Sequence, residues 1–194
     1  MENSLSEIHP LEPFFPKGAG ILMLGSFPPQ KARWSMDFYY PNLQNDMWRI
    51  MGIVFYGNKE YFLSETKKAF DKERICAFLT EKGIALSDTA VEIVRRKGNA
   101  SDQYLEVIKP LDIEKALQFL SSCRAIVTTG QKATDTLLEL LPVVAPKVGE
   151  YAEFDYLARR LRLYRMPSSS RAYPKPLEEK AAVYGQMFKE LGLL

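Results

Sequence analysis

The stretch that decides the fold reads Gly20-Ile21-Leu22-Met23-Leu24 and continues as Gly25-Ser26-Phe27-Pro28-Pro29. The unbroken apolar run, which starts near Gly18, predicts a strand buried on both faces, as in a parallel sheet covered by helices. It ends in a turn of small and proline residues, where Gly25 lets a ligand approach the backbone closely. Because parallel sheets bind ligands beyond the carboxyl ends of their strands, this turn predicts one wall of a ligand pocket.

Outward from this strand, apolar spacing predicts an alternation of helices and strands along the chain. We expect further strands at residues 84–87, 125–129, 151–156 and 160–165, and helices at residues 45–51, 61–70, 71–82, 112–121, 133–141 and 177–191. Gly83 and Asp112 favour a helix stop and a helix cap. The order predicts an α/β fold, with a three-layer α/β/α arrangement around a central, mostly parallel sheet. The length of 194 residues fits one domain over residues 1–194, with residues 1–17 as a polar N-terminal lead-in.

Polar residues, glycine and proline follow the ends of four predicted strands, at residues 25–27, 87–89, 129–131 and 166–170. A second polar cluster lies between Phe38 and Trp48, where aromatic residues are followed by amides and an acid. Tyr40 fits either a core position or a platform on which a flat ring stacks, and the neighbouring amides favour the platform because buried amides need partners. Asn45 fits a helix cap, a role that is compatible with holding a ligand or a water molecule.

The charge of the chain is nearly balanced, with a net charge of +2, so the total indicates no polyanionic partner. The distribution is more informative, because six cations and no acid lie between Arg159 and Lys175. A second basic cluster is Arg95-Arg96-Lys97. Each cluster fits either contacts with nucleic-acid phosphates or an ordinary solvated face, and the sequence leaves both open.

Several kinds of chemistry are disfavoured by what the sequence lacks. The single histidine, His9, lies in the N-terminal lead-in and no Cys/His cluster occurs, so we expect neither a metal site nor a Ser-His-Asp triad. Cys76 and Cys123 lie in apolar contexts, which favours buried free thiols over a disulfide or a nucleophile. The glycine-rich nucleotide-binding motifs do not occur, and we expect no cofactor. Without a signal peptide or an apolar run that could span a bilayer, we expect a soluble, cytoplasmic protein.

Five short motifs occur in a defined order within residues 18–190. They are Gly25-Ser26-Phe27-Pro28, Tyr40 with Asn45-Asp46-Met47-Trp48, the strand that ends at Asp88, Gly130-Gln131-Lys132-Ala133, and Met166-Pro167-Ser168-Ser169-Ser170. In this order the chain resembles the uracil-DNA glycosylase superfamily and looks most similar to its mismatch-specific and hypoxanthine-DNA glycosylases. The resemblance implies base-excision repair: a monofunctional enzyme that hydrolyses the N-glycosidic bond of a flipped-out uracil or hypoxanthine in DNA.

The resemblance also implies roles for individual residues. Asn45 matches the asparagine on which the hypoxanthine type relies, so it is the implied catalytic residue. The implied base pocket consists of Gly25, Ser26, Phe27, Tyr40 and Asp88. The implied DNA-binding residues are Lys132, Ser168, Ser169, Ser170 and Arg171. The implied partner is DNA with a damaged or mismatched base, bound by a monomer.

Three positions depart from the family pattern. Phe27 stands where many members carry Asp or Asn to position the attacking water, and Met166 stands where many carry His or Asn. Asp88 stands where other members read the base with Asn. The resemblance therefore leaves Asn45 as the catalytic residue, and we expect it to hold the water that attacks the sugar.

The remaining parts of the expected mechanism follow from this assignment. The base stacks on Tyr40 against Phe27, and Asp88 with backbone N–H groups near Ser26 reads its edge. Asp46 or Asp37 assists electrostatically, and the basic run from Arg159 supplies salt-sensitive affinity. Two other functions fit the same residues: a module that binds damaged or single-stranded DNA without catalysis, and an N-glycosidase of free nucleosides.

Overall fold

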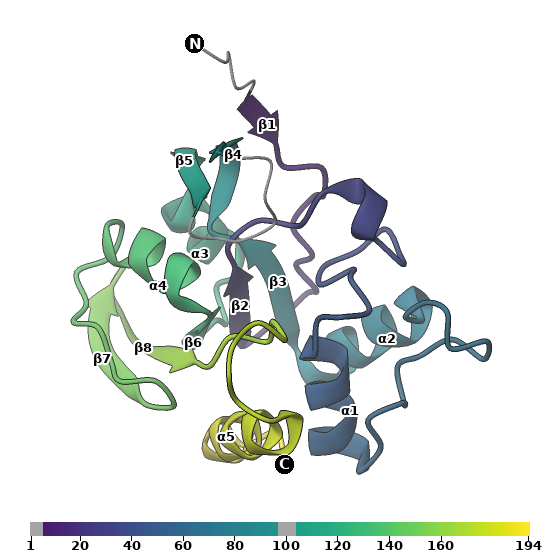
Figure 1. The fold of residues 1–194 in the computed structure, drawn as a ribbon. Helices are drawn as coiled ribbons and strands as arrows, with labels where there is room; N and C mark the ends of the chain where they lie inside the picture. The colour runs from purple at the N-terminus through teal and green to yellow at the C-terminus, as the bar shows by residue number, and fades with distance from the viewer. Residues whose placement is uncertain (1–5, 97–103) are drawn as a thin grey trace.

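A five-stranded sheet runs through the centre of the computed structural model, which describes residues 6–96 and 104–194 (Figure 1). Within these residues its strand order is β3-β2-β6-β8-β7. The bounds are Ile21–Gly25 for β2, Ile84–Asp88 for β3, Ala125–Thr129 for β6, Tyr151–Tyr156 for β7 and Arg159–Met166 for β8. Neighbouring strands are parallel except β7 and β8, which are antiparallel. The predicted mixed α/β fold with a mostly parallel central sheet is confirmed.

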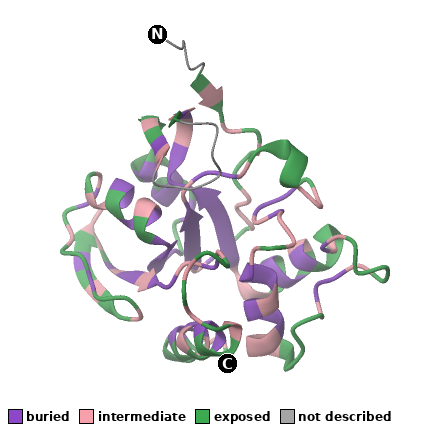
Figure 2. Ribbon diagram, viewed as in Figure 1, coloured by how far each residue is buried: buried purple, intermediate pink, exposed green. Residues whose placement is uncertain are grey.

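The central sheet buries side chains on both of its faces. Because successive side chains of a strand point to opposite faces, Ile21 and Met23 of β2 join one core, whereas Leu22 and Leu24 join another. The first core includes residues of α1 (Met47–Tyr56), α2 (Lys72–Lys82) and α5 (Leu177–Glu190), and the second includes residues of α3 (Ile113–Phe119) and α4 (Gln131–Leu138). Helices therefore pack on both faces, and Figure 2 shows the strands between them as buried.

Capping residues determine where several helices begin and end. The Asp71 carboxylate accepts from the backbone N–H of Arg74 at 3.0 Å, and that of Asp112 accepts from the N–H of Lys115 at 3.0 Å. Gly83 ends α2 with a φ of 65°, a left-handed conformation that favours glycine. The predicted boundaries of α2 and α3 are thus confirmed to within two residues. Within residues 6–96 and 104–194, no helix has the length and apolar character that crossing a membrane requires.

Two segments differ from the sequence-based prediction of helices. The helix predicted over residues 61–70 is wrong: Leu63 and Phe70 form an isolated antiparallel bridge, and Lys67 turns the chain with a φ of 57°. The apolar spacing there arises because the chain doubles back and buries Phe62 and Phe70 in the first core. Helix α4 begins at Gln131 rather than at residue 133, because the N–H and the hydroxyl of Thr134 both donate to the carbonyl of Gly130.

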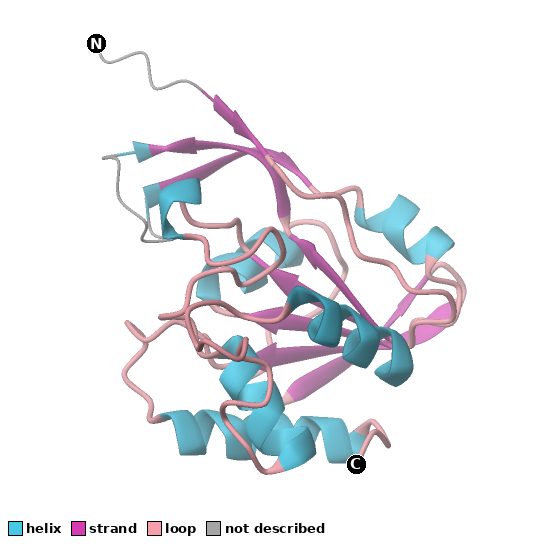
Figure 3. Ribbon diagram, turned by 90° about the vertical axis from the view of Figure 1, so that its right-hand side faces the viewer, coloured by secondary structure: helices cyan, strands magenta, loops and turns pink. Residues whose placement is uncertain are grey.

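A second, antiparallel sheet lies outside the sequence-based prediction. Its strands are β1 (Ser6–Ile8), β4 (Ala90–Arg95) and β5 (Leu105–Pro110), in the order β1-β4-β5 (Figure 3). β4 begins almost directly after β3, and β1 pairs with β4 along the edge away from β5. Further along, Phe14 and Leu86 form an antiparallel bridge. The segment expected as a polar lead-in therefore lies beside β3 and its continuation, close to the carboxyl edge of the central sheet.

Two helical glycines have opposite surroundings and give a paired stability prediction. A Cβ atom on Gly52 in α1 would lie 2.3 Å from the backbone oxygen of Asn58, whereas one on Gly185 in α5 would lie 3.8 Å from the nearest Val54 methyl. We expect Gly52→Ala to lower the free energy of unfolding by about 1–3 kcal/mol, because backbone must move. Gly185→Ala should raise it by about 1 kcal/mol, because alanine favours the helix. Urea unfolding of both variants checks this, and equal stabilities would contradict it.

Candidate active site

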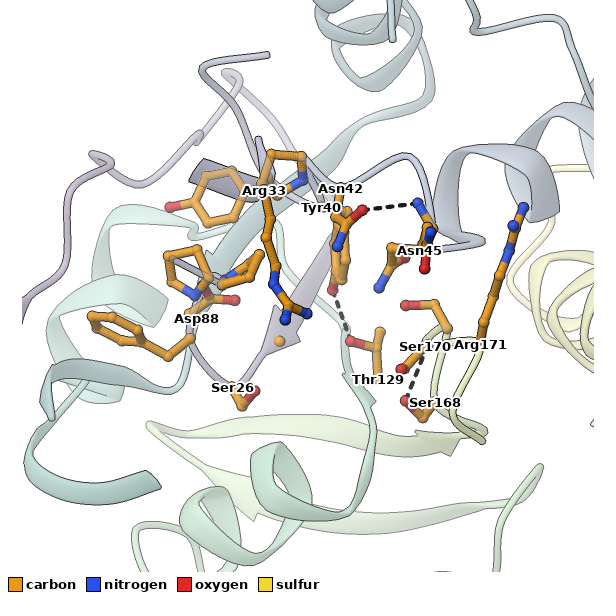
Figure 4. Close-up of a pocket in the computed structure, with 18 of the residues that line it drawn as sticks. Ser26, Arg33, Tyr40, Asn42, Asn45, Asp88, Thr129, Ser168, Ser170 and Arg171 are labelled. Atoms are coloured by element: carbon orange, nitrogen blue, oxygen red, sulfur yellow. Dashed lines mark hydrogen bonds between the residues drawn. The ribbon is translucent and has the colours of Figure 1, made fainter. Parts of the chain in front are cut away.

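A pocket of about 280 Å³ lies beyond the carboxyl ends of β2, β3, β6 and β8 (Figure 4). This is the edge at which parallel sheets bind ligands. It is lined by ten of the residues expected at the site, namely Gly25, Ser26, Phe27, Tyr40, Asn45, Asp88, Ser168, Ser169, Ser170 and Arg171. The eleventh, Lys132, is half-buried on α4 and does not line the pocket. The strand ends thus bring together residues that lie far apart in the sequence.

Gly25 is required by a close approach between β2 and β3. The two strands are parallel and pair Gly25 with Asp88. A Cβ atom on Gly25 would lie 2.4 Å from Oδ1 of Asp88 and 3.3 Å from the hydroxyl of Tyr40. Any side chain at this position would displace the carboxylate or the phenol from the pocket. The glycine therefore keeps both polar groups in place, rather than only permitting a turn.

Tyr40 is fixed in the pocket wall by its backbone and by both ends of its side chain. Its φ of 51° lies in the left-handed region, which is strained for a residue with a side chain. Its hydroxyl forms a 2.7 Å hydrogen bond with Oγ1 of Thr129, and Figure 4 shows it pointing toward that residue. Its ring packs edge to face on Trp48, with 6.0 Å between centroids. The predicted platform is thus a rigid ring that lines the pocket.

Asn45 lies one residue before Asp46, the N-cap of α1, and lines the pocket. Its Oδ1 accepts from the backbone N–H of Met47 at 2.9 Å, which satisfies one of the free donors at the start of the helix. Within residues 6–96 and 104–194, no acceptor is hydrogen-bonded to its Nδ2. The amide group thus keeps two N–H donors and one oxygen lone pair available to a ligand or a water molecule. The sequence left open whether Asn45 stabilises the start of the helix or holds a ligand or water molecule, and this geometry is compatible with both.

Asp46 is buried and bound to two cations. Only 5% of the residue is exposed, and its carboxylate lies 3.0 Å from Nε of Arg171 and 3.5 Å from Nζ of Lys180. Nζ of Lys180, itself buried, also donates to the carbonyl of Ser170 at 2.8 Å. The charge of Asp46 is therefore already compensated by the protein. Asp37 is exposed and pairs with Lys31, so neither acid is placed as the expected electrostatic helper.

The serine loop, residues 167–171, is anchored to its neighbours at several backbone positions. The N–H of Asp46 donates to the carbonyl of Ser169 at 2.8 Å, and the hydroxyl of Tyr184 in α5 donates to the carbonyl of Pro167 at 2.9 Å. Within the loop, Oγ of Ser168 accepts from the N–H of Ser170 at 3.2 Å. The loop is therefore held against the start of α1 and against α5. Ser168 and Ser170 line the pocket from this fixed backbone.

His9 belongs to the surroundings of the pocket, which sequence reasoning missed. Its Nε2 lies 2.8 Å from Oδ2 of Asp88, and both side chains are less than a tenth exposed. The imidazole packs edge to face on Phe27 and stacks near Tyr39. Burial and, secondarily, the Asp88 carboxylate raise the pKa of Tyr39, so its neutral phenol donates to the carbonyl of Glu12 at 3.1 Å. Nothing in the sequence relates His9 to a strand end 79 residues later.

The basic run from Arg159 does not form one phosphate-binding face. Arg159 donates to backbone carbonyls around the end of α3, and both Arg160 and Arg162 pair with Glu153. These three residues lie at the amino end of β8, away from the pocket at its carboxyl end. Only Arg171 of the run lines the pocket, and that the whole run supplies DNA affinity stays a prediction.

The second basic cluster is also engaged elsewhere, whereas a cation that the sequence did not single out lies at the pocket. Arg95 is buried and paired with Glu7, Arg96 pairs with Glu106, and Lys97 lies outside the described residues. Arg33 lines the pocket and has no acidic partner within residues 6–96 and 104–194. Figure 4 shows Arg33 and Arg171 on either side of Asn45.

The cysteines contribute no reactive group to the pocket. Both Cys76 and Cys123 are free thiols, as predicted. Burial raises the pKa of the Cys123 thiol to about 11 and raises that of Cys76 as well, which disfavours the nucleophilic thiolate. Within the described parts of the chain, no group of three or more His, Cys, Asp or Glu side chains is placed to hold a metal ion.

The ion pairs of Asp46 give a second stability prediction. Lys180→Met should lower the free energy of unfolding by about 3 kcal/mol, because it removes the buried partner of a buried carboxylate. Arg171→Met should cost about 1 kcal/mol or less, because that side chain is 51% exposed. Urea unfolding of the two variants measures the difference. A loss for Lys180→Met no larger than for Arg171→Met would show that the buried pair is not the stronger one.

The fold is similar to that of a solved protein structure. The chain aligns with the solution NMR structure of a "putative Uracil DNA glycosylase" from Methanosarcina acetivorans, with a TM-score of 0.61 and 21% sequence identity. The alignment covers 93% of this chain and 97% of that one. No protein-family model matches the chain, and no curated protein matches it. The similarity extends over nearly the whole chain, and it shows that the two proteins share a fold.

Proposed function

We propose that this protein is a DNA N-glycosylase of the uracil-DNA glycosylase superfamily, from its mismatch-specific and hypoxanthine branch. It would hydrolyse the N-glycosidic bond of a flipped-out uracil or hypoxanthine in DNA. The observation that carries the proposal is the pocket itself, in which a rigid aromatic ring, a carboxylate acceptor and an available amide meet at the sheet edge. The shared fold with the Methanosarcina protein supports it. A three-layer arrangement belongs to this proposal and is supported by the helices on both faces of the sheet.

The pocket suits a base that has left the double helix. Flipping costs a few kcal/mol, which contacts with the extruded base must offset. Tyr40 offers a rigid aromatic ring as a stacking surface and Phe27 an apolar wall. The Asp88 carboxylate, on the pocket wall beside Gly25, accepts hydrogen bonds from the polar edge of the base. A pocket lined in this way favours a planar ring that has apolar faces and a polar edge.

We propose that Asn45 holds the water that attacks the sugar. Glycosidic cleavage proceeds through an oxocarbenium-like sugar, which needs little help from a base to capture water. The C1′–N bond breaks with its electron pair going to the base, and the water oxygen bonds to C1′ and releases a proton. The Asn45 amide donates through Nδ2 and accepts through the second lone pair of Oδ1, so it orders this water. Its hydrogen bond with the N–H of Met47 fixes the amide in place.

The pocket rim supplies contacts for the DNA backbone. Ser168, Ser170 and backbone N–H groups of the serine loop suit phosphate oxygens, which many protein–DNA complexes contact in this way. Arg33 and Arg171 lie at the same opening and add positive charge. Because Arg159, Arg160 and Arg162 are engaged at the amino end of β8, the two cations at the opening carry the electrostatic part of the proposed binding.

A second candidate is a module that binds damaged DNA without cleaving it. The observation in its favour is that Phe27 and Met166, at positions where many family members place a polar catalytic group, are apolar and buried. This alternative predicts tight binding to lesion DNA with no base release. It also predicts that binding does not depend on the Asn45 amide.

The first functional prediction concerns base release and the amide of Asn45. Duplexes that contain uracil, hypoxanthine or a G·T mismatch are incubated with the protein, and abasic sites are measured by alkaline strand cleavage. We expect release of at least one of these bases, and we expect Asn45→Ala and Asn45→Ser to slow it by about 100-fold, because the water is no longer ordered.

The serine variant is the matched control, because serine retains a side-chain oxygen that accepts from a backbone N–H at the start of α1. If Asn45→Ser were fully active while Asn45→Ala was slow, the residue would act through the helix and not on water. If no base were released even with a large excess of protein, the glycosylase proposal would fail for these substrates.

The second functional prediction concerns the cations at the rim. Arg33→Gln should weaken binding to lesion and undamaged duplexes alike, and should reduce the slope of log affinity against log salt by about 1, because one phosphate contact is lost. Fluorescence anisotropy over a range of salt concentrations measures both. Arg160→Gln, which removes the same charge at the far end of β8, is the control and should leave the slope unchanged. Equal effects of the two variants would show that Arg33 has no specific role.

A further inference from the structure

His9 and Asp88 form a buried pair behind the pocket, and no part of the mechanism above uses the histidine. We propose that His9 is a positioning residue for base recognition: it binds one oxygen of the Asp88 carboxylate, so that the other oxygen accepts a hydrogen bond from a ring N–H of the flipped base. This inference rests on the proposed function for the identity of the ligand. It gives the N-terminal segment a part in substrate choice.

The contact with Asp88 requires a proton on Nε2 of His9, whichever role Nδ1 takes. An ionised carboxylate only accepts hydrogen bonds, so Nε2 donates to Oδ2 of Asp88 across 2.8 Å. On the other side of the ring, the backbone N–H of Leu11 lies 3.1 Å from Nδ1 and its carbonyl lies 2.9 Å away. The N–H donates to a bare Nδ1, and the carbonyl accepts from a protonated one. Either way, the contact with Asp88 is retained.

The imidazole is held rigidly enough to fix the carboxylate. Its centroid lies 5.1 Å from that of Phe27 in an edge-to-face contact and 6.0 Å from that of Tyr39 in a stacked one. The backbone N–H of His9 donates to the carbonyl of Val91 in β4 at 2.8 Å, which ties the segment to the small sheet. Only 8% of the side chain is exposed, so the protein surrounds the ring on most sides.

The second oxygen of Asp88 faces the pocket without a partner. Oδ1 occupies the space beside Gly25, and Asp88 lines the pocket although its side chain is only 7% exposed. Among the described residues, no donor is hydrogen-bonded to this oxygen. Because this oxygen is not among the fully buried polar atoms that lack a partner, it is open to the pocket. Its lone pairs are therefore available to a donor that a ligand supplies.

The donor that a base can supply is the group that deamination creates. Cytosine and adenine carry a bare ring nitrogen, an acceptor, at N3 and N1 respectively. Uracil and hypoxanthine carry an N–H at the same positions. A carboxylate oxygen attracts the N–H and repels the bare nitrogen, so one acceptor distinguishes both deaminated bases from their parent bases. The substrate class is thus a base with a ring N–H on its pairing edge, and either ring size satisfies the contact.

The test changes one atom of the base and one residue of the protein. Binding is measured by fluorescence anisotropy with duplexes that carry 2′-fluoro nucleotides, which resist cleavage. Each lesion is compared with a deaza analogue, 3-deazauracil or 1-deazahypoxanthine, in which C–H replaces the N–H donor. A duplex with a tetrahydrofuran abasic analogue reports binding that needs no base. The variants are His9→Ala and His9→Gln, since the glutamine amide also donates.

For the wild-type protein we expect the lesion to bind about tenfold or more tightly than its deaza analogue, as a hydrogen bond to a charged group implies. In His9→Ala this ratio should fall to within about threefold of 1, and in His9→Gln most of it should remain. Affinity for the abasic duplex should stay within twofold in all three proteins. This last measurement separates positioning of Asp88 from a merely structural role, which would weaken all duplexes together.

Three results would overturn the inference. They are an unchanged ratio in His9→Ala, an equal loss of affinity for lesion and abasic duplexes, and a wild-type ratio near 1. None of these depends on cleavage, so the inference can fail while base release by the wild-type protein stands. Conversely, a protein that releases no base but shows the expected ratios would retain the inference and lose the glycosylase proposal.

Discussion

The burial of the Asp46 carboxylate is the constraint on which the geometry of the pocket depends. A charge removed from water must be paired, and the chain pairs this one with Lys180 of α5 and Arg171 of the serine loop. The same residue contributes its backbone N–H to the loop and stands directly before α1. Three segments that lie far apart in the sequence are thus joined at one side chain. The amide of Asn45, one residue earlier, takes its position from that junction.

The opposite wall of the pocket contains a second carboxylate, that of Asp88, which is paired in a different way. Asp88 is bound by His9 through one oxygen only, and the glycine at position 25 leaves room for the other. Asp46 is therefore a structural charge whose field is cancelled within the protein, whereas Asp88 remains available to a ligand. Asp88 lines the pocket whereas Asp46 does not, and the different roles of the two acids are determined by their partners rather than by their residue type.

The sequence predicts the central fold well because its signals are local. The apolar run at residues 20–24, the cap Asp112 and the stop at Gly83 each act on their own segment, and the structure confirms all three. The resemblance to a known superfamily also identified most of the pocket lining. The helix over residues 61–70 failed because apolar spacing alone does not distinguish a helix from a loop that buries two phenylalanines.

The contacts that sequence reasoning missed are all long-range. Pairing between His9 and Asp88, between Asp46 and Lys180, and between Arg95 and Glu7 depends on how the chain returns to the sheet edge. The partners of the arginines that follow Arg159 could not be predicted for the same reason. The pairing of β7 with β8 places Arg160 and Arg162 beside Glu153, which lies earlier in the chain. Local patterns predicted the elements, whereas the partners of charged side chains required the tertiary structure.

The distance in sequence between the pocket walls has a consequence for how the protein is made. Lys180 leaves the ribosome long after His9, Asp46 and Asp88. Until α5 emerges, Asp46 lacks its buried partner and the serine loop lacks two of its anchors. A nascent chain can form β2 and β3 early, but the complete pocket exists only once α5 has emerged. A ligand that needs both walls of the pocket can therefore bind only after α5 has joined them.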